Sequence, residues 1–339
     1  MSRKGSSPKW RGTQGSRKKQ AGAGKAGLFT LLAAFVLAAV MIALNGVAYR
    51  VNGLPTVRSI LRSLGIAKYP QVENADGDVA VHFIDVGQGD CILIDTGETA
   101  VLIDSGEVGC GEGVVEYIDS CGIQKLDYVI ATHPHSDHIG GMPEVLADLA
   151  VGQVVFPPLP DSKIPMSKVY EDTLDIIEEK DIPVYDAQPG ERLRIGQGTY
   201  LDIIAPLHND YDNLNDFSVV TRLIHGSNTF LLTGDMERAS ENDVLNSGAV
   251  VASNVLKVAH HGSTSSSTPA FLKEVAPQYA VISVGDGNSY GHPKAEVLER
   301  LKAVGAQILR TDELGTIVFV SDGGSISVYT AKYGEMEAA

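Results

Sequence analysis

Thr132-His133-Pro134-His135-Ser136-Asp137-His138-Ile139-Gly140-Gly141 is the stretch of this 339-residue sequence that decides its fold. Three histidines and one aspartate fall within six residues, directly after the apolar run 128–131. A loop at the end of a strand lets His133 and His135 converge on one ion, while Asp137 and His138 turn toward a neighbouring position. Imidazole and carboxylate groups are the ligands that suit zinc, manganese or iron. The sequence therefore predicts a metal site at this strand end.

From residue 79 onward, short β-rich runs alternate with helical patterns. Strands are expected at residues 79–86, 91–95, 100–104, 128–131, 154–156, 200–205, 219–225, 229–233, 255–259, 279–284, 307–310, 316–320 and 325–329. Helices are expected at residues 113–121, 142–149, 167–180, 236–246, 269–275 and 294–304. Mixed sheets covered by helices on their outer faces fit this order.

Several other motifs accompany the histidine cluster along the chain. They are Leu102-Ile103-Asp104-Ser105-Gly106, Leu232-Thr233-Gly234-Asp235 and Leu256-Lys257-Val258-Ala259-His260-His261-Gly262-Ser263. Residues 133–138 resemble the HxHxDH signature of the metallo-β-lactamase superfamily of metallohydrolases. The three other motifs resemble the strand ends that accompany this signature in the superfamily. The resemblance implies an α+β fold, an αββα sandwich with the metal site along one edge of two packed sheets.

The resemblance can be narrowed to a subfamily. Residues 82–90 (HFIDVGQGD), the His-His-Gly-Ser element and Tyr290-Gly291-His292-Pro293 resemble the extracellular hydrolase domain of ComEC-type DNA-uptake proteins. The resemblance covers residues 79–330 and does not extend to the membrane channel of those proteins. The chain therefore looks like a stand-alone member of this subfamily, held to the membrane by one helix instead of a channel.

The resemblance also implies roles for individual residues. Asp235 would bridge two cations and lower the pKa of a shared water, giving a metal-activated hydroxide that attacks a phosphoryl or acyl centre. Asp137 is a candidate ligand and proton acceptor. His260 is the preferred final ligand because it comes first after its strand, which leaves His261 to touch the substrate, although the two roles could be exchanged. The predicted metal ligands are therefore His133, His135, Asp137, His138, Asp235 and His260.

One segment departs from the wider superfamily pattern. Many members supply a third histidine to the first metal from the segment before Asp235, where this chain reads Asn213-Leu214-Asn215-Asp216. His208, in the loop 206–210, is a weaker alternative. Oxygen ligands at the first metal favour manganese over a tight zinc site. We expect one or two divalent ions per chain, Zn or Mn.

His292 lies in the Gly- and Asn-rich loop 285–293, just before a predicted helix. A histidine at this position is well placed to contact a phosphate or a leaving group. The predicted catalytic residues are Asp137, His261 and His292.

The amino-terminal segment differs from the rest of the chain. Residues 1–50 carry nine basic and no acidic side chains, and residues 26–49 are an uncharged run of 24. A membrane-spanning helix needs about 20 apolar residues, whereas a signal-peptide core has about 7–15. The positive flank should stay in the cytoplasm, which puts the hydrolase domain outside the cell membrane. Cleavage near Gly46-Val47-Ala48 would instead give a secreted protein.

The expected organisation is a basic cytoplasmic tail (1–25), a transmembrane signal-anchor helix (26–49), a linker (50–78), the hydrolase domain (79–330) and a C-terminal tail (331–339). Three cysteines are too few for a disulfide framework. Cys110 and Cys121 flank a predicted helix and could pair in an oxidising compartment.

The net charge of the chain after its basic tail indicates which class of substrate it can bind. Residues 51–339 hold 18 basic and 42 acidic side chains, a formal net charge of −24. Nucleic-acid binders normally carry a basic surface, so a phosphodiester is better supported than DNA in particular. A basic groove at His133, to which Lys257, Lys273, Lys294 and Lys302 could contribute, would favour DNA, and an acidic rim would count against it.

The leading hypothesis is a metal-dependent hydrolase, a phosphodiesterase or nuclease. The alternatives are a small-molecule hydrolase acting on a cyclic nucleotide, lactone or ester, and a non-catalytic, membrane-tethered binding module. Neither the motifs nor the composition identifies a protein partner.

Overall fold

The computed structural model describes residues 72, 75–332 and 334–336. The predicted tail (1–25), the predicted transmembrane helix (26–49) and most of the predicted linker (50–78) lie outside the described residues. Within the described ranges, no helix is both long and apolar enough to cross a bilayer.

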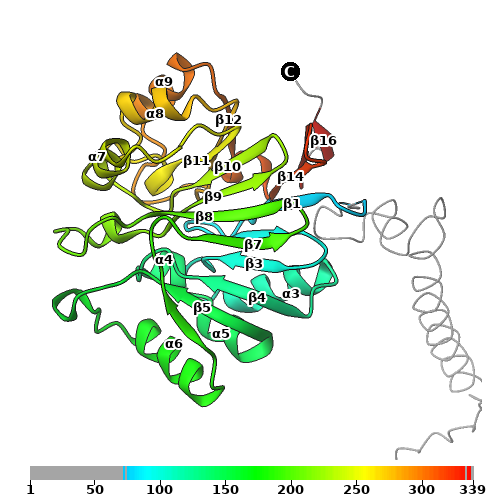
Figure 1. Cartoon of the computed structure of the whole chain (residues 1–339), viewed down its shortest axis with the longest axis vertical. Coiled ribbons are helices and arrows are strands. Elements are labelled where there is room, and N and C mark those ends of the chain that lie inside the picture. The colour runs from blue at the N-terminus through cyan, green and yellow to red at the C-terminus, as the bar shows by residue number, and fades with distance from the viewer. Residues whose placement is uncertain (1–71, 73–74, 333, 337–339) are drawn as a thin grey trace, which may run out of the picture. The chain divides into compact units, whose positions relative to one another are not determined.

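Two mixed β-sheets form the centre of the domain that begins at residue 79 (Figure 1). In spatial order, the first sheet contains β16 (Gly334–Met336), β15 (Ile326–Thr330), β14 (Ile317–Ser321), β1 (Val79–Phe83), β2 (Ile92–Asp95), β3 (Ala100–Ile103), β4 (Lys125–Ile130), β5 (Ala150–Phe156) and β6 (Val184–Asp186). Its strands pair antiparallel from β16 to β3 and parallel from β3 to β6.

The second sheet has the same mixed character. In spatial order it contains β13 (Gln307–Arg310), β12 (Tyr279–Ile282), β11 (Val255–Lys257), β10 (Asn228–Leu232), β9 (Val220–His225), β8 (Thr199–Ala205) and β7 (Arg192–Gly196). Its strands pair parallel from β13 to β10 and antiparallel from β10 to β7.

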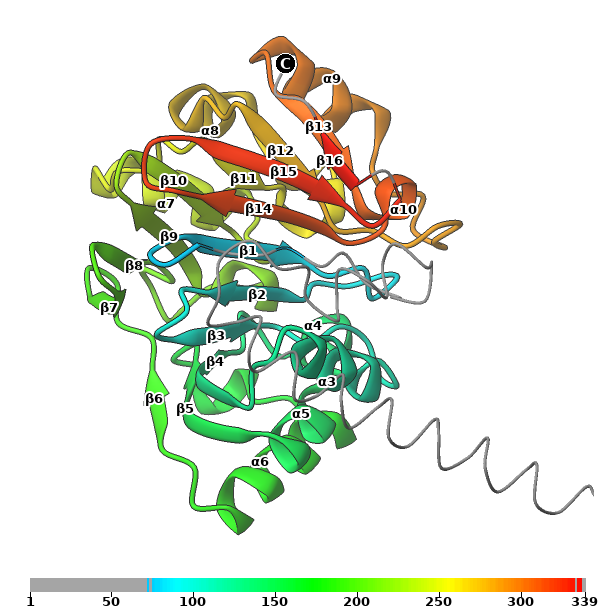
Figure 2. The same cartoon turned by 90° about the vertical axis from the view of Figure 1, so that its right-hand side faces the viewer.

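Helices cover the outer faces of both sheets (Figures 1 and 2). On the first sheet these are α3 (Gly111–Ser120), α5 (Met142–Asp148) and α6 (Lys168–Glu179). On the second sheet they are α7 (Arg238–Ser247), α8 (Pro269–Val275) and α9 (Ala295–Ala303). The architecture is the predicted αββα sandwich.

Alternation along the strands explains why three apolar layers form. In β2, Ile92 and Ile94 point between the sheets, whereas Leu93 points to the helices. Neighbouring β3 follows the same rule, with Val101 between the sheets and Leu102 under the helices. Because both faces of these strands are buried, their sequences read as continuous apolar runs.

The predicted strands and helices are all present, and the structure adds several short elements. These are β6, β7, β16, α4 (Ser136–Ile139), α10 (Thr311–Leu314) and the 3₁₀ turns η1 (Asp161–Lys163), η2 (Leu214–Phe217) and η3 (Ala259–Gly262). β16 pairs with β15, so part of the predicted tail 331–339 belongs to the first sheet.

The possible Cys110–Cys121 disulfide does not form. The two residues cap opposite ends of α3, whose ten residues rise about 15 Å, far beyond the Cα separation that a disulfide allows. Cys110 is free, and its thiol donates a hydrogen bond to the Val86 carbonyl (3.3 Å).

Candidate metal centre

Most of the predicted ligands gather where strands of both sheets end. The histidine cluster 133–138 follows β4 of the first sheet, while Asp235 follows β10 and the pair His260-His261 follows β11 of the second. His260 and His261 both have left-handed backbones, with φ of 49° and 50°. The chain therefore turns sharply there, and the two adjacent imidazoles reach different partners.

Four of these residues form one compact group. The ligand atoms of Asp137, His138, Asp235 and His261 all lie within 4.8 Å of one another. Asp235 Oδ2 is 3.3 Å from His138 Nε2, and His261 Nε2 is 3.3 Å from Asp137 Oδ2. Two ligands on a tetrahedral ion with bonds of about 2.0–2.1 Å also lie about 3.3 Å apart. The spacing matches that of ligands around a single cation.

The hydrogen-bonding state of these atoms supports the same interpretation. His138 Nε2, Asp235 Oδ1 and His261 Nε2 are buried and have no hydrogen-bond partner. Buried polar atoms without partners are costly, and these three converge on one point. The residues present therefore fit a divalent cation.

The group contains His261, whereas the sequence favoured His260 as the final ligand. Nδ1 of His261 contacts the Ser283 carbonyl at 2.8 Å, which directs Nε2 toward the two aspartates. His260 lies closer to solvent, with Nδ1 3.0 Å from Glu237 Oε1 and Nε2 3.8 Å from Asp235 Oδ2. The geometry favours exchanging the two predicted roles.

His133 and His135 form a second set beside Asp235. His133 Nε2 lies 3.0 Å from His135 Nδ1 and 4.0 Å from Asp235 Oδ2. Asp235 thus lies between this pair and the other three residues of the group, as a bridging carboxylate would. His208, the weaker alternative ligand, lies apart from the centre and pairs with Asp243 at 3.8 Å.

Asp104 orients one of the candidate ligands. His138 Nδ1 donates a hydrogen bond to Asp104 Oδ2 (2.7 Å), and the same carboxylate accepts hydrogen bonds from the Thr132 backbone and hydroxyl (2.8 and 2.7 Å). A proton fixed on Nδ1 leaves the Nε2 lone pair of His138 free to bind a cation.

A buried ion pair lies behind the centre. Lys257 Nζ is 2.7 Å from Asp90 Oδ2, and both side chains are almost completely buried. The other oxygen of Asp90 is 3.4 Å from His261 Nδ1. Asp90, Asp104 and His138 also form a group of metal-ligand type, but Lys257 already pairs with Asp90, and His138 Nδ1 with Asp104. The prediction that Lys257 could line a DNA-binding groove is therefore wrong.

Burial and neighbouring charges together set the protonation of the candidate ligands. Burial is the main cause that lowers the pKa of both His133 and His135, so these imidazoles are neutral. Burial alone would raise the pKa of Asp235, but His138 and His261 hold it well below its usual range. Burial would lower the pKa of His138, but Asp235 and Asp104 raise it well above its usual value. Binding a cation would therefore displace protons from the site.

His292 lies at the edge of the centre, on the loop before α9. Its ring is 5.7 Å from that of His260, centroid to centroid, and stacks on Tyr290. Burial, followed by the neighbouring His260 and His261, lowers the pKa of His292 to about 4. His292 is therefore neutral near pH 7, and its imidazole donates or accepts hydrogen bonds without carrying charge.

The family model of the metallo-β-lactamase superfamily matches residues 84–286, more than half of the chain. The chain belongs to the metallo-β-lactamase superfamily. This superfamily match spans the histidine cluster, Asp235 and the His260-His261 pair, so the candidate metal centre lies within the family domain.

Curated relatives confirm the narrower resemblance to competence proteins. ComE operon protein 3 of Bacillus subtilis is 33% identical over 74% of this chain, and Competence protein ComA of Neisseria gonorrhoeae is 30% identical over 79%. The alignments cover 34% and 36% of those relatives, so the chain spans about a third of their length. The metallo-beta-lactamase fold protein YhfI of Bacillus subtilis covers 72% of this chain and all of its own, at 14% identity and a TM-score of 0.49.

Sequence reasoning missed three residues that support the centre. Glu237 accepts hydrogen bonds from Asn215 Nδ2 (3.0 Å) and His260 Nδ1, yet no motif distinguished it. The sequence indicates Asp104 only as part of the motif 102–106, and Asp90 only as part of the motif 82–90. The one available signal was Lys257, since a lysine inside an apolar strand requires a buried anionic partner.

Proposed function

We propose that this chain is a metal-dependent phosphodiesterase. The observation that carries the proposal is the group Asp137, His138, Asp235 and His261, whose ligand atoms lie within 4.8 Å of one another. Two carboxylates and two imidazoles suit a hydrolytic zinc or manganese centre. The resemblance to ComEC-type DNA-uptake proteins makes a phosphodiester the favoured substrate class.

A divalent cation bound there would supply a water of low pKa as nucleophile and positive charge for the phosphoryl oxygens. Asp235 can serve two ions, because Oδ1 faces His261 Nε2 of the four-residue group at 3.6 Å and Oδ2 lies 4.0 Å from His133 Nε2 of the second set. Asp137 is the most solvent-accessible of the four, with 25% of its side chain exposed, against 3% or less for the other three. Its carboxylate is therefore placed to accept the proton of an attacking water.

His260 and His292 are assigned to substrate contact. His260 Nδ1 is held by Glu237, which leaves Nε2 directed toward Asp235 and the open side of the centre. Neutral His292 lies next to it and would hydrogen-bond a phosphoryl or leaving-group oxygen.

DNA is a second candidate substrate, supported by the competence relatives. Its difficulty is the charge of the surroundings. The pocket beside Asp137 is lined by Glu107 and by no lysine or arginine, and Lys257 is buried in its ion pair. The lining of this pocket is thus acidic rather than basic, although Lys294 lies beside it on the Tyr290 carbonyl, and we favour a short diester over a long polyanion.

The test uses the full chain in detergent, stripped of metal with a chelator and then supplied with Mn²⁺ or Zn²⁺. Hydrolysis of bis(p-nitrophenyl) phosphate should appear only with metal, and Asp235→Asn should reduce it to background. His208→Ala, outside the centre, is the matched control and should behave as wild type. Metal binding without turnover of this diester would overturn the proposal, and turnover of an ester or lactone instead would support the small-molecule alternative.

We also propose that residues 26–49 anchor the protein in the cell membrane with the hydrolase domain outside. The uncharged run of 24 residues after a basic tail supports this. Protease added to intact cells should digest the hydrolase domain while the tail stays protected. Recovery of the whole chain in the high-speed supernatant would contradict the anchor.

A further inference from the structure

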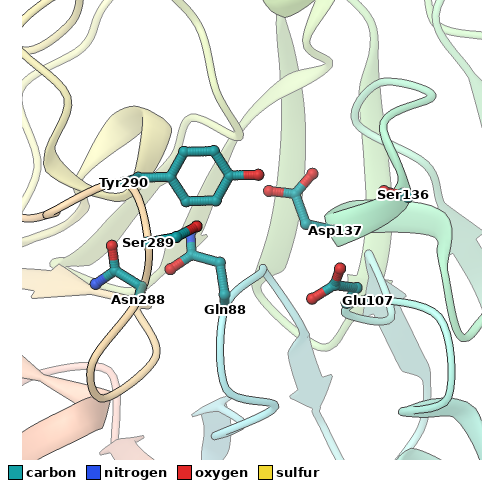
Figure 3. Close-up of a pocket in the computed structure, with 7 residues that line it drawn as sticks. All are labelled: Gln88, Glu107, Ser136, Asp137, Asn288, Ser289 and Tyr290. Carbon is teal, nitrogen blue, oxygen red and sulfur yellow. The ribbon is translucent and has the colours of Figure 1, made fainter.

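A pocket of about 260 Å³ adjoins the candidate metal centre on the side of Asp137 (Figure 3). Three loops and the start of α4 contribute to it. Its lining residues are Gln88, Glu107, Ser136, Asp137, Asn288, Ser289 and Tyr290. Asp137 belongs to both the pocket and the metal centre, so a molecule in the pocket lies next to the reacting phosphate.

The chemistry of the lining excludes a second phosphate. The seven residues offer amides, hydroxyls and two carboxylates, and none of them is cationic. Asp137 would be engaged by the metal centre, so a second phosphate in the pocket would meet the Glu107 carboxylate and no cation of the lining. The nearest lysine identified there, Lys294, lies outside the lining, with Nζ 2.6 Å from the Tyr290 carbonyl. The amides and hydroxyls of the lining suit an occupant that is not anionic and that makes hydrogen bonds.

Tyr290 gives the pocket an aromatic wall. Its side chain is 61% exposed, the only tyrosine among the exposed large hydrophobic residues that the structure describes. One face of the ring stacks on His292, at 5.8 Å between centroids and 23° between planes, and the hydroxyl points toward Asp137 (Figure 3). An exposed ring that is held from one side offers a planar ligand a surface to stack on.

The loop that carries Tyr290 is held in place before any ligand arrives. Asn288 Nδ2 donates to the carbonyls of Gly285 (3.0 Å) and His292 (2.7 Å), and its Oδ1 accepts from the His292 backbone (3.0 Å). Gln88 Oε1 accepts from the Gly285 backbone (3.3 Å), which fixes the Gln88 amide at the pocket. Such fixed side chains lose little entropy when a ligand binds.

We infer that this pocket binds the nucleoside part of the substrate, with the base stacked on Tyr290 and its polar edge facing Gln88 and Glu107. The inference rests on the proposed phosphodiesterase function and names its substrate class as a nucleotide diester. A nucleobase is planar, uncharged and rich in hydrogen-bonding groups, which matches each property of the lining. Clefts that bind drug-sized ligands have volumes of about 300 Å³ or more, and this pocket is smaller. Its volume therefore suits one nucleoside rather than a run of nucleotides.

The experiment compares two diesters with the same leaving group on the full chain loaded with Mn²⁺. Thymidine 5′-(p-nitrophenyl phosphate) carries a nucleoside, and methyl p-nitrophenyl phosphate does not, so any stacking of the nitrophenyl ring cancels. Base stacking predicts a kcat/KM about tenfold or more higher for the thymidine diester in the wild type. Tyr290→Ala should bring this ratio close to one, while Tyr290→Phe should keep it.

Tyr200→Ala is the matched control, because Tyr200 lies on β8 under the Arg192 guanidinium and outside the pocket. It should keep the wild-type ratio. A ratio near one in the wild type, or one that survives Tyr290→Ala, would overturn the nucleoside pocket while leaving the phosphodiesterase intact. Turnover of neither diester would overturn the phosphodiesterase, and the nucleoside pocket with it.

Discussion

Replacing Lys257 by methionine should strongly destabilise this protein. The Lys257 ammonium is 2.7 Å from Asp90 Oδ2 and donates a hydrogen bond to the Val258 carbonyl (2.9 Å), and its side chain is fully buried. Methionine has a similar length and no charge, so the Asp90 carboxylate would stay buried without a cation. Removing one partner of a buried ion pair costs about 3–5 kcal/mol.

The assay is urea unfolding of the full chain in detergent, followed by circular dichroism. With an m value of about 3 kcal/mol per molar, the midpoint should fall by roughly 1–1.7 M. The double variant Lys257→Met/Asp90→Asn removes both charges and should recover at least about 2 kcal/mol of the free energy of unfolding.

The surface pair Lys125–Asp127 provides the control. Its atoms are equally close, at 2.6 Å, but the Lys125 side chain is 57% exposed. Lys125→Met should therefore cost less than about 1 kcal/mol. If Lys257→Met cost no more than Lys125→Met, the account of Lys257 as the cation that neutralises Asp90 would be refuted.

Three further predictions concern orientation, pH and packing. Asp104→Asn should weaken Mn²⁺ binding about 10–100-fold, measured by equilibrium dialysis, because Asp104 fixes the proton on His138 Nδ1; unchanged affinity would count against this role. Burial lowers the pKa of His82 to about 4. Between pH 6.5 and 4 the unfolded chain therefore binds a proton at His82 that the folded chain does not. The free energy of unfolding should fall by up to roughly 3 kcal/mol as the pH falls through this range. His82→Gln should flatten that part of the stability profile, and an unchanged slope would contradict the assignment. Gly140→Ala should destabilise the protein by about 3 kcal/mol or more, because the added Cβ would lie 2.1 Å from the Val108 backbone nitrogen. The control is Gly113→Ala in α3, whose Cβ meets nothing within 4 Å and which should be neutral or stabilising. Equal melting temperatures of the two variants would disprove the steric explanation.

The sandwich and much of its site could be predicted because they depend on local patterns. Apolar runs mark the strands, and the histidine cluster that begins at His133 directly after such a run indicated a site at a sheet edge. Asp235 was assigned through the resemblance to the metallo-β-lactamase superfamily. The short edge strands β6 and β7 give no strand pattern because β6 has no buried residue and β7 has only two. Three residues at β16 were also too few to give a pattern.

The choice between His260 and His261 shows a different limit. Both follow the same strand, and the directions of their side chains depend on two successive left-handed backbone conformations. A histidine in the sequence does not predict such a conformation. Glu237 and Asp90 likewise act through partners that are distant in the sequence, such as Asn215 and Lys257. Spacing along the chain carries no information on such contacts.

The most direct test of the metal centre is a count of bound ions. Metal-depleted full chain is dialysed against Mn²⁺, and the bound metal is measured for the wild type, Asp235→Asn and His208→Ala, with circular dichroism confirming that each is folded. We predict one or two ions per chain for the wild type and His208→Ala, and a loss of at least one ion for Asp235→Asn. Equal stoichiometry and affinity in all three would contradict a centre built around Asp235.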